Sequence, residues 1–235
     1  MNGNGLDGIL CVDKPVGFTS HDVVALVRRR FRLEKVGHGG TLDPSATGLL
    51  ILLLGKATKL SDRIMGGDKV YKGVMRLGVE TSTQDAEGEA LRTGDLSKVT
   101  EPALREAMAA LTGDLQQIPP MVSAIKKGGV ALYKLARKGE VVEREPRLVH
   151  IYDFKLLEFG IPDSQIEVRC SKGTYVRTLC HDVGLSLGCY GHLATLRRLK
   201  SGNFDIAQAI SVDALKKLHT QDDLKPFMLS MTTAV

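Results

Sequence analysis

The sequence predicts a mixed α/β domain of the α+β type, with largely antiparallel strand pairing. The chain has 235 residues, of which 43% are hydrophobic and 25% are charged, so it is long enough to bury a sizeable core. Segments that alternate like strands interleave with segments of helical spacing, and the sequence shows no regular βαβ spacing and no repeat. These observations exclude disordered and fibrous classes.

The predicted elements follow one another in a definite order. Residues 8–13 (GILCVD) predict a strand, and a helix begins near His21 with Thr19 or Ser20 as N-cap. Residues 49–54 predict a buried strand or helix segment, and the alternation in 71–77 predicts a half-buried strand. Thr100 and Pro102 mark the start of another helix. Residues 149–159 and 165–170 predict strands, and helices are expected within 174–184 and 211–219.

The longest unbroken apolar run is six residues, Leu49 to Leu54, whereas a membrane helix needs about 20. The N-terminal segment has no basic stretch, no long apolar stretch and no small-residue cleavage site. We therefore expect a cytoplasmic protein with no membrane partner. The four cysteines form no C-x-x-C pair, so neither a disulfide framework nor a metal site is expected.

Positive charge is unevenly distributed along the chain, although the net charge is only +5. Between Met121 and Arg147 there are seven basic residues and three acidic ones. Two further basic clusters are Arg28–Arg30 and the group Arg197, Arg198 and Lys200. Concentrated positive charge favours a phosphate backbone as partner. Composition leaves open the alternative that these are solvated basic faces.

Residues 35–50, KVGHGGTLDPSATGLL, contain more turn-forming residues than one turn needs. Glycine has no Cβ and adopts backbone conformations closed to other residues, so this stretch predicts a backbone that closely approaches a partner. It is no nucleotide loop, because Gly55-Lys56 lacks the preceding glycine and the following Ser or Thr of a phosphate loop. Gly3, Gly5 and Gly8 precede a strand instead of following one, which argues against a dinucleotide site.

The same stretch resembles the signature of the TruB family of tRNA pseudouridine synthases, here GHGGTLDPSATGLL. Other segments match further family motifs in order: KPVGFTSHDVV (14–24), YKGVMRLGVETSTQDAEG (71–88), KGTYVRTLCHDVG (172–184) and LRRLKSGNF (196–204). The basic segment over about 119–147 resembles the family's thumb loop. Together these matches extend from about residue 8 to residue 204.

The resemblance implies the pseudouridine synthase fold, a mixed and mostly antiparallel central sheet with flanking helices and a basic thumb loop. It implies isomerisation of uridine 55 in the T-loop of tRNA, without a cofactor. We expect a catalytic domain over 1–204 and a short helical tail over 205–235. Only 31 residues follow Phe204, too few for the C-terminal RNA-binding PUA domain that bacterial relatives usually carry. The expectation is therefore a short form.

The resemblance also implies the catalytic residues. Asp43 matches the aspartate that acts as nucleophile or helps to expel uracil through a glycal, and the sequence leaves both pathways open. Burial would raise the pKa of such a carboxylate unless a cation compensated, and Arg177 matches the arginine expected to pair with it. Tyr71 matches the tyrosine that stacks on the flipped base and is a candidate to abstract a proton.

Further matches concern RNA binding. Tyr175 and Leu196 match residues that line the base pocket, and Lys14 matches a residue expected to brace the active-site loop. His38 would enter the space that the flipped uridine leaves, while Gly39 and its glycine neighbours let the backbone approach the T-loop. Contacts to the RNA backbone are expected from the thumb: Lys126, Lys127, Lys134, Arg137 and Arg144.

Two other functions compete with this interpretation. The same pocket would suit a chaperone that unfolds and refolds the tRNA elbow, and a relative guided by a second RNA would act on ribosomal RNA. The complete Asp43, Tyr71 and Arg177 set favours retained chemistry, and the absence of long basic tails favours an enzyme that acts alone as a monomer on the tRNA T-arm.

Overall fold

The computed structural model describes residues 6–123, 125–136, 140 and 142–234. The chain divides into two compact units. Unit 1 comprises Met1–Tyr71 and Leu196–Val235, and unit 2 comprises Lys72–Thr195. Two strands, β4 (Lys69–Leu77) and β12 (Gly191–Ser201), have residues in both units.

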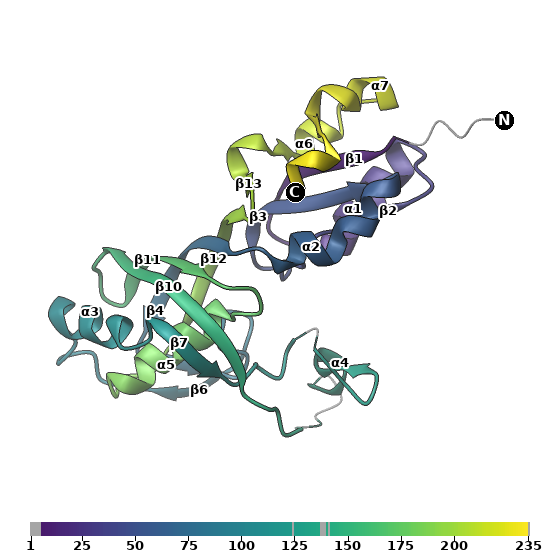
Figure 1. Cartoon of the computed structure of the whole chain (residues 1–235). Helices are drawn as coiled ribbons and strands as arrows, with labels where there is room; N and C mark the ends of the chain where they lie inside the picture. Colours follow the sequence, from purple (N-terminus) through teal and green to yellow (C-terminus); the bar gives the residue numbers. More distant parts are fainter. Residues whose placement is uncertain (1–5, 124, 137–139, 141, 235) are drawn as a thin grey trace. The chain divides into compact units, whose positions relative to one another are not determined.

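Unit 1 is built on a mixed sheet (Figure 1) in the strand order β14-β1-β3-β12. β1 (Gly8–Lys14) pairs antiparallel with β3 (Thr47–Leu54) and parallel with β14 (Ile210–Ser211). β3 pairs parallel with β12 and antiparallel with the short β2 (Val36–His38). The remaining elements of unit 1 are α1 (Ser20–Arg30), the 3-10 helix η1 (Gly55–Leu60), α2 (Ser61–Gly66), β13 (Phe204–Asp205), η2 (Ile206–Gln208), α6 (Val212–Leu215), α7 (Gln221–Leu224), η3 (Lys225–Phe227), β15 (Met228–Leu229) and η4 (Met231–Ala234).

The apolar run in β3 forms a strand because both faces of the sheet are covered in unit 1. Leu50, Leu52 and Leu54 face a core that contains Val23 and Val27 of α1. The alternate residues of β3 face a second core, which contains Ile64 of α2 and Phe204. Strand side chains alternate between the two faces, so a strand buried on both sides is continuously apolar. This confirms the strand interpretation of residues 49–54.

The sequence signals for α1 are confirmed. Thr19 is the N-cap, its hydroxyl accepts a hydrogen bond from the Asp22 backbone, and the Asp22 carboxylate accepts one from the Thr19 backbone. This reciprocal pair is a capping box, which satisfies two backbone donors that the first turn leaves unpaired. Val23, Val27 and Phe31 are buried, as their spacing predicts.

Unit 2 contains strands in the order β4-β11-β10-β7, with Gly191 at the start of β12 next to Arg76 and Leu77 of β4. β10 (Arg147–Glu158) pairs antiparallel with both β11 (Asp163–Cys170) and β7 (Gly113–Gln117). The helix α3 (Glu101–Ala109) begins after the predicted cap Thr100 and packs against β10 and α5 (Val176–Ser186). A separate hairpin is formed by β5 (Val79–Thr81) and β6 (Ala90–Thr93). A mixed, mostly antiparallel sheet with flanking helices is therefore confirmed.

The segment between β7 and β10 is a long excursion that carries α4 (Leu132–Ala136), as Figure 1 shows. A small hairpin of β8 (Lys126–Lys127) and β9 (Val130–Ala131) precedes α4, and Gly128 and Gly129 turn it with positive φ angles. The sequence predicts a short helix over 131–138, and its end at Lys138 lies outside the described residues. An excursion with a short helix is present where the thumb is expected.

The segment after Phe204 folds onto unit 1. Val212, Leu215 and Leu224 from α6 and α7 contribute to the same core as α1, and β14 and β15 pair with β1. The segment therefore contains strand pairs as well as the expected helices. No helix among the described residues is long and apolar enough to cross a membrane.

Candidate active site

The loop between β2 and β3, residues 39–46, carries Asp43 and is called the aspartate loop below. Asp43 is solvent-exposed and directly precedes a turn at Pro44 and Ser45. The turn is closed by a hydrogen bond of 3.1 Å from the Ala46 amide to the Asp43 carbonyl. A carboxylate on such a loop is accessible to a large substrate. The structure therefore presents Asp43 at the surface of unit 1.

Glycine is required at the start of the aspartate loop. A Cβ on Gly39 would lie 2.4 Å from Cγ2 of Ile64, so only glycine fits against this buried side chain. Gly40 has a φ of +126°, a conformation that favours glycine. The sequence predicts that these glycines permit a close approach. In unit 1 the close approach at Gly39 is to the protein's own core.

Two buried polar side chains hold the backbone on either side of Asp43. Lys14 is completely buried, and its Nζ donates to the carbonyls of Pro15, Phe18 and Pro44 at 2.9, 2.7 and 3.3 Å. The Ser20 hydroxyl accepts from the Leu42 amide at 2.8 Å and donates to the Leu42 carbonyl at 3.0 Å. Lys14 thus braces the loop, the role that its motif predicts. Ser20 is a brace that sequence reasoning did not identify, because a serine at a helix start is expected to cap.

His38 ends β2 and is half-buried. Burial lowers its pKa, and the nearby charges of Arg198 and His21 lower it further. The Gly40 amide lies 3.4 Å from Nδ1 of His38, so Nδ1 is the acceptor and Nε2 carries the proton of the neutral ring.

Tyr71 and Leu196 both belong to unit 1, at the positions where β4 and β12 enter it. Both are half-buried, and both pack against the core that contains α1. The core of unit 1 therefore holds part of each side chain in place.

In unit 2, Arg177 lies in the first turn of α5 and is buried. Its Nη1 donates to Oδ2 of Asp85 at 2.8 Å, and its Nη2 donates to the Val122 carbonyl at 2.5 Å. Asp85 also accepts from the Thr83 hydroxyl and from the Glu87 amide. Sequence reasoning missed Asp85, although it lies within the matched segment 71–88.

Tyr175 directly precedes α5 and is held through its backbone. Oε1 of the buried Gln117 accepts from the Tyr175 amide at 2.7 Å, and Nε2 of Gln117 donates to the Tyr175 carbonyl at 3.1 Å. The Arg177 guanidinium lies 5.7 Å from the centre of the Tyr175 ring, a cation–π distance. Unit 2 thus brings Tyr175 and Arg177 together, and Gln117 is a further residue that no motif revealed.

The predicted RNA-backbone residues that the structure describes lie on the excursion of unit 2. Lys126 and Lys127 form β8, and Lys134 lies in α4. Arg144 is half-buried and donates to the Pro119 carbonyl at 3.2 Å, which joins the two ends of the excursion. Arg137 lies outside the described residues.

The basic group near the C-terminal end of β12 is not a continuous phosphate-binding surface. Arg197 forms two hydrogen bonds with Asp13, at 2.9 and 2.7 Å. Lys200 lies 3.2 Å from Asp205. Arg198 is 1% exposed and bonds to backbone carbonyls. Arg198 is therefore neither an exposed ligand for an RNA phosphate nor part of a solvated basic face, the two alternatives that its charge suggests.

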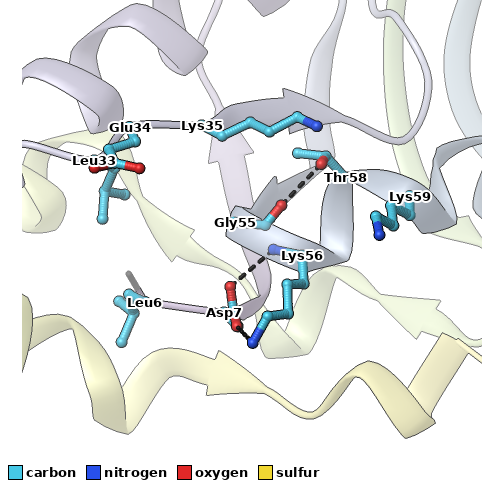
Figure 2. Close-up of a pocket in the computed structure, with 9 residues that line it drawn as sticks. All are labelled: Leu6, Asp7, Leu33, Glu34, Lys35, Gly55, Lys56, Thr58 and Lys59. Atoms are coloured by element: carbon cyan, nitrogen blue, oxygen red, sulfur yellow. Dashed lines mark hydrogen bonds and ion pairs between the residues drawn. The ribbon is translucent and has the colours of Figure 1, made fainter. Parts of the chain in front are cut away.

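Unit 1 also has a surface pocket of about 270 Å³, which Figure 2 shows. Two of its lining residues, Lys56 and Asp7, form an ion pair of 3.1 Å. The hydroxyl of a third, Thr58, donates to the Gly55 carbonyl. Its lining contains none of the predicted site residues. We assign it a structural role, because Asp7 also accepts from the Lys56 amide and so fixes the start of β1 to η1. Across the described residues, no group of three or more His, Cys, Asp or Glu side chains is arranged to hold a metal ion.

Comparison with known proteins agrees with this geometry. Residues 28–176 match the model of the TruB family pseudouridylate synthase N-terminal domain, and residues 177–235 match that of the tRNA pseudouridylate synthase B C-terminal domain. The tRNA pseudouridine synthase B of Opitutus terrae is 53% identical over 91% of this chain and 88% of its own length. The enzyme of the same name from Syntrophotalea carbinolica is 47% identical over 98% of this chain and 75% of its own length.

Solved structures give the same fold. A chain in the crystal structure of a Cbf5-Nop10-Gar1 complex superposes with a TM-score of 0.76 at 31% identity, covering 97% of this chain and 61% of that one. A structure of an H/ACA RNP bound to a substrate RNA superposes with a TM-score of 0.72 at 28% identity, covering 97% and 60%. The pseudouridine synthase fold expected from the motifs is confirmed. The chain belongs to the TruB family of pseudouridylate synthases.

Proposed function

We propose that this isomerase converts uridine 55 in the T-loop of tRNA to pseudouridine. One observation carries the proposal: an exposed carboxylate, Asp43, on a loop whose backbone is held on both sides by the buried side chains of Lys14 and Ser20. Relatives named tRNA pseudouridine synthase B support tRNA as the substrate. The basic excursion of unit 2 supports binding of an RNA backbone.

The reaction needs a group that handles C1′ of the ribose while the base is detached. The Asp43 carboxylate either attacks C1′ as the N1–C1′ bond breaks or assists formation of a glycal. Uracil then turns over and C5 bonds to C1′. In the first pathway this breaks the Asp43–C1′ ester bond, and in the second the C2′ proton that glycal formation removed is returned. The C5 proton is released and N1 takes up a proton, so the product is an isomer of the substrate. No oxidant, reductant or metal is consumed in this isomerisation. Tyr71 is proposed to stack on the base and to assist removal of the C5 proton.

The other site residues are proposed to bind and orient the RNA. His38, neutral because its pKa is lowered, is suited to occupy the space in the T-loop that the flipped base leaves. Tyr175 and Leu196 are proposed to contact the base, and Arg177 to stabilise negative charge during the reaction. The Asp85 carboxylate holds the Arg177 guanidinium in one orientation, which limits the reorganisation that the reaction requires.

We propose that the protein acts on the tRNA T-arm as a cytoplasmic monomer, with no obligatory protein or guide-RNA partner. The thumb residues Lys126, Lys127, Lys134, Arg137 and Arg144 are proposed to contact the phosphate backbone. Such contacts position the RNA without specifying its sequence, so the shape of the T-loop would provide selectivity.

The test uses an unmodified tRNA transcript that carries tritium at C5 of its uridines. Formation of each pseudouridine replaces the C5–tritium bond, so one tritium is released to water. We expect the protein alone to release one equivalent, and to release none from a transcript with cytidine at position 55. Asp43→Asn should abolish release, whereas Asp62→Asn, an exposed aspartate of the same unit, should not.

Two results would refute the proposal. Tight tRNA binding without release by the wild-type protein would indicate a folding chaperone or a requirement for a guide RNA. Release that is unchanged in the cytidine 55 transcript would place the target elsewhere in the tRNA.

A further inference from the structure

Arg198 is an unusual residue of β12 because its guanidinium is buried and its hydrogen bonds go to main-chain carbonyls. Nε donates to the Leu49 carbonyl at 2.8 Å, Nη1 to the Thr41 carbonyl at 3.2 Å, and Nη2 to the Gly40 carbonyl at 3.1 Å. Two of these acceptors lie in the aspartate loop, and the third lies in β3. A single side chain thus joins the loop to the sheet of unit 1.

The chemistry of this contact requires arginine. A guanidinium presents its donors in a rigid planar fork, so three nitrogens can meet three separate carbonyls at once. A lysine has one ammonium on a flexible stem and cannot reproduce this geometry. Burying the charge has a desolvation cost that the hydrogen bonds must offset. Such an arrangement indicates a specific role for the residue at this position.

The local backbone is shaped to admit the Arg198 side chain. β12 and β3 pair in parallel with Arg198 opposite Gly48. Gly48 has a φ of +98°, and a Cβ there would lie 2.3 Å from the Arg198 carbonyl oxygen. A Cβ on Gly40 would lie 3.7 Å from Nη1 of Arg198. The contact at Gly40 is an ordinary one, whereas glycine at position 48 is required for β3 and the backbone of β12 to approach each other beside Arg198.

With Arg198 included, the polar backbone groups on both sides of Asp43 are bound by buried side chains. Arg198 binds the carbonyls of Gly40 and Thr41, Ser20 binds both polar groups of Leu42, and Lys14 binds the carbonyl of Pro44. Arg198 also lies two residues after Leu196, on the same face of the strand, since strand side chains alternate. It therefore connects the strand of a proposed base contact to the loop of the proposed catalytic carboxylate.

We propose that Arg198 is a positioning residue for the pseudouridine synthase reaction: it fixes the aspartate loop relative to β12, and it is not a ligand of an RNA phosphate. This inference rests on the proposed function and adds a residue to which the sequence analysis gave no role beyond membership of a basic cluster. Its effect on the reaction is exerted through the position of Asp43. Misplacement of a reacting group by about 1 Å can reduce a rate about 100-fold.

The test compares Arg198→Gln and Arg198→Lys with Lys200→Gln, a control two residues further along the same strand whose side chain is 57% exposed. For each variant, the rate constant for tritium release is measured in a single turnover, with the protein in excess and at a concentration that saturates binding of the T-arm RNA. The dissociation constant is measured at several salt concentrations. We expect Arg198→Gln to lower the rate constant about 100-fold and Arg198→Lys about 10-fold. Lys200→Gln should retain the wild-type rate.

The dissociation constant and its salt dependence distinguish positioning from phosphate binding. Loss of a phosphate ligand reduces the slope of log K against log salt by about one. We expect both Arg198 variants to keep the wild-type slope and to bind within about threefold of wild type. A slope reduced by about one, together with an unchanged rate at saturation, would overturn the proposal.

Amide hydrogen exchange provides a readout that does not depend on activity. We expect exchange in residues 39–46 to accelerate in Arg198→Lys and to stay unchanged in Lys200→Gln, measured well below the melting temperature of each variant. If Arg198→Gln does not fold, the proposal is tested with Arg198→Lys alone. A wild-type rate constant and a wild-type exchange pattern in Arg198→Lys would then overturn the proposal. If the wild-type protein releases no tritium, the proposed function has failed. The exchange result then still tests whether Arg198 holds the loop.

Discussion

Replacing Asp85 by asparagine removes a negative partner of the buried Arg177 guanidinium while leaving the shape of the side chain almost unchanged. The side chains of Arg177 and Asp85 are 5% and 10% exposed, and they are 2.8 Å apart. Breaking a buried ion pair by removing one partner costs about 3–5 kcal/mol in the free energy of unfolding. For a chain of 235 residues this lowers the melting temperature by about 6–10 °C.

Unit 2 offers a matched control in a second arginine–aspartate pair. Arg76 and Asp163 form two hydrogen bonds, at 2.7 and 2.6 Å, but their side chains are 46% and 40% exposed. Solvent screens this pair, so Asp163→Asn should cost at most about 1 kcal/mol, although the pair lowers the pKa of Asp163. Judged only by the number and length of its hydrogen bonds, the Arg76–Asp163 pair would be the stronger of the two.

The assay is thermal and urea unfolding of the wild-type protein and both variants, followed by circular dichroism and by fluorescence of an extrinsic dye. We expect Asp85→Asn to unfold well below Asp163→Asn, with the same dependence on urea concentration. Equal unfolding temperatures for the two variants would refute the argument that burial sets the strength of the Arg177 pair.

Three further predictions follow from the described side chains. Burial lowers the pKa of His38 in the folded state, so folding favours the neutral ring. The contribution of this ring to the free energy of unfolding is therefore complete above pH 6.5 and is lost as the pH falls through the lowered pKa. The hydrogen bond to Asp182 raises the pKa of His181 in the folded state. The contribution of the charged His181 ring to the free energy of unfolding is therefore complete below pH 6.5 and is lost as the pH rises through the raised pKa. NMR titration of the His38 and His181 rings should show midpoints on opposite sides of 6.5. Burial raises the pKa of Cys11 to about 12, and all four thiols are buried, so a thiol reagent at pH 8 should modify the native chain slowly and all four sites after denaturation. Gly48→Ala should destabilise unit 1 by at least about 1–2 kcal/mol from its positive φ alone, and a chemical-denaturation midpoint equal to wild type would contradict this.

Much of the fold could be predicted because local signals and burial agree. Local signals in the sequence mark the N-caps of α1 and α3 and the buried apolar run of β3. The structure contains all three features. β12 was missed because its sequence, GHLATLRRLKS, combines charged and apolar residues without strict alternation. Its polar residues are accommodated by particular partners, such as Asp13 for Arg197, and not by solvent.

The site could be predicted only as far as the motifs name residues. Lys14 was predicted to brace a loop, and the structure shows the three carbonyls that it binds. Asp85 and Gln117 were missed because their partners lie 92 and 58 residues away in the sequence. Spacing cannot reveal such pairs. Arg198 was grouped with its neighbours by charge, and only its burial distinguishes it from them.

The central claim is that Asp43 catalyses pseudouridine formation at position 55 of tRNA, and it is tested most directly by locating the product. An unmodified tRNA transcript is incubated with the wild-type protein or with Asp43→Asn, treated with carbodiimide, and reverse-transcribed; fluorescence anisotropy checks that both proteins bind the transcript. The account predicts a reverse-transcription stop one nucleotide 3′ of position 55 with the wild-type protein and none with the variant. A stop of equal strength with Asp43→Asn, or modification confined to another position, would contradict it.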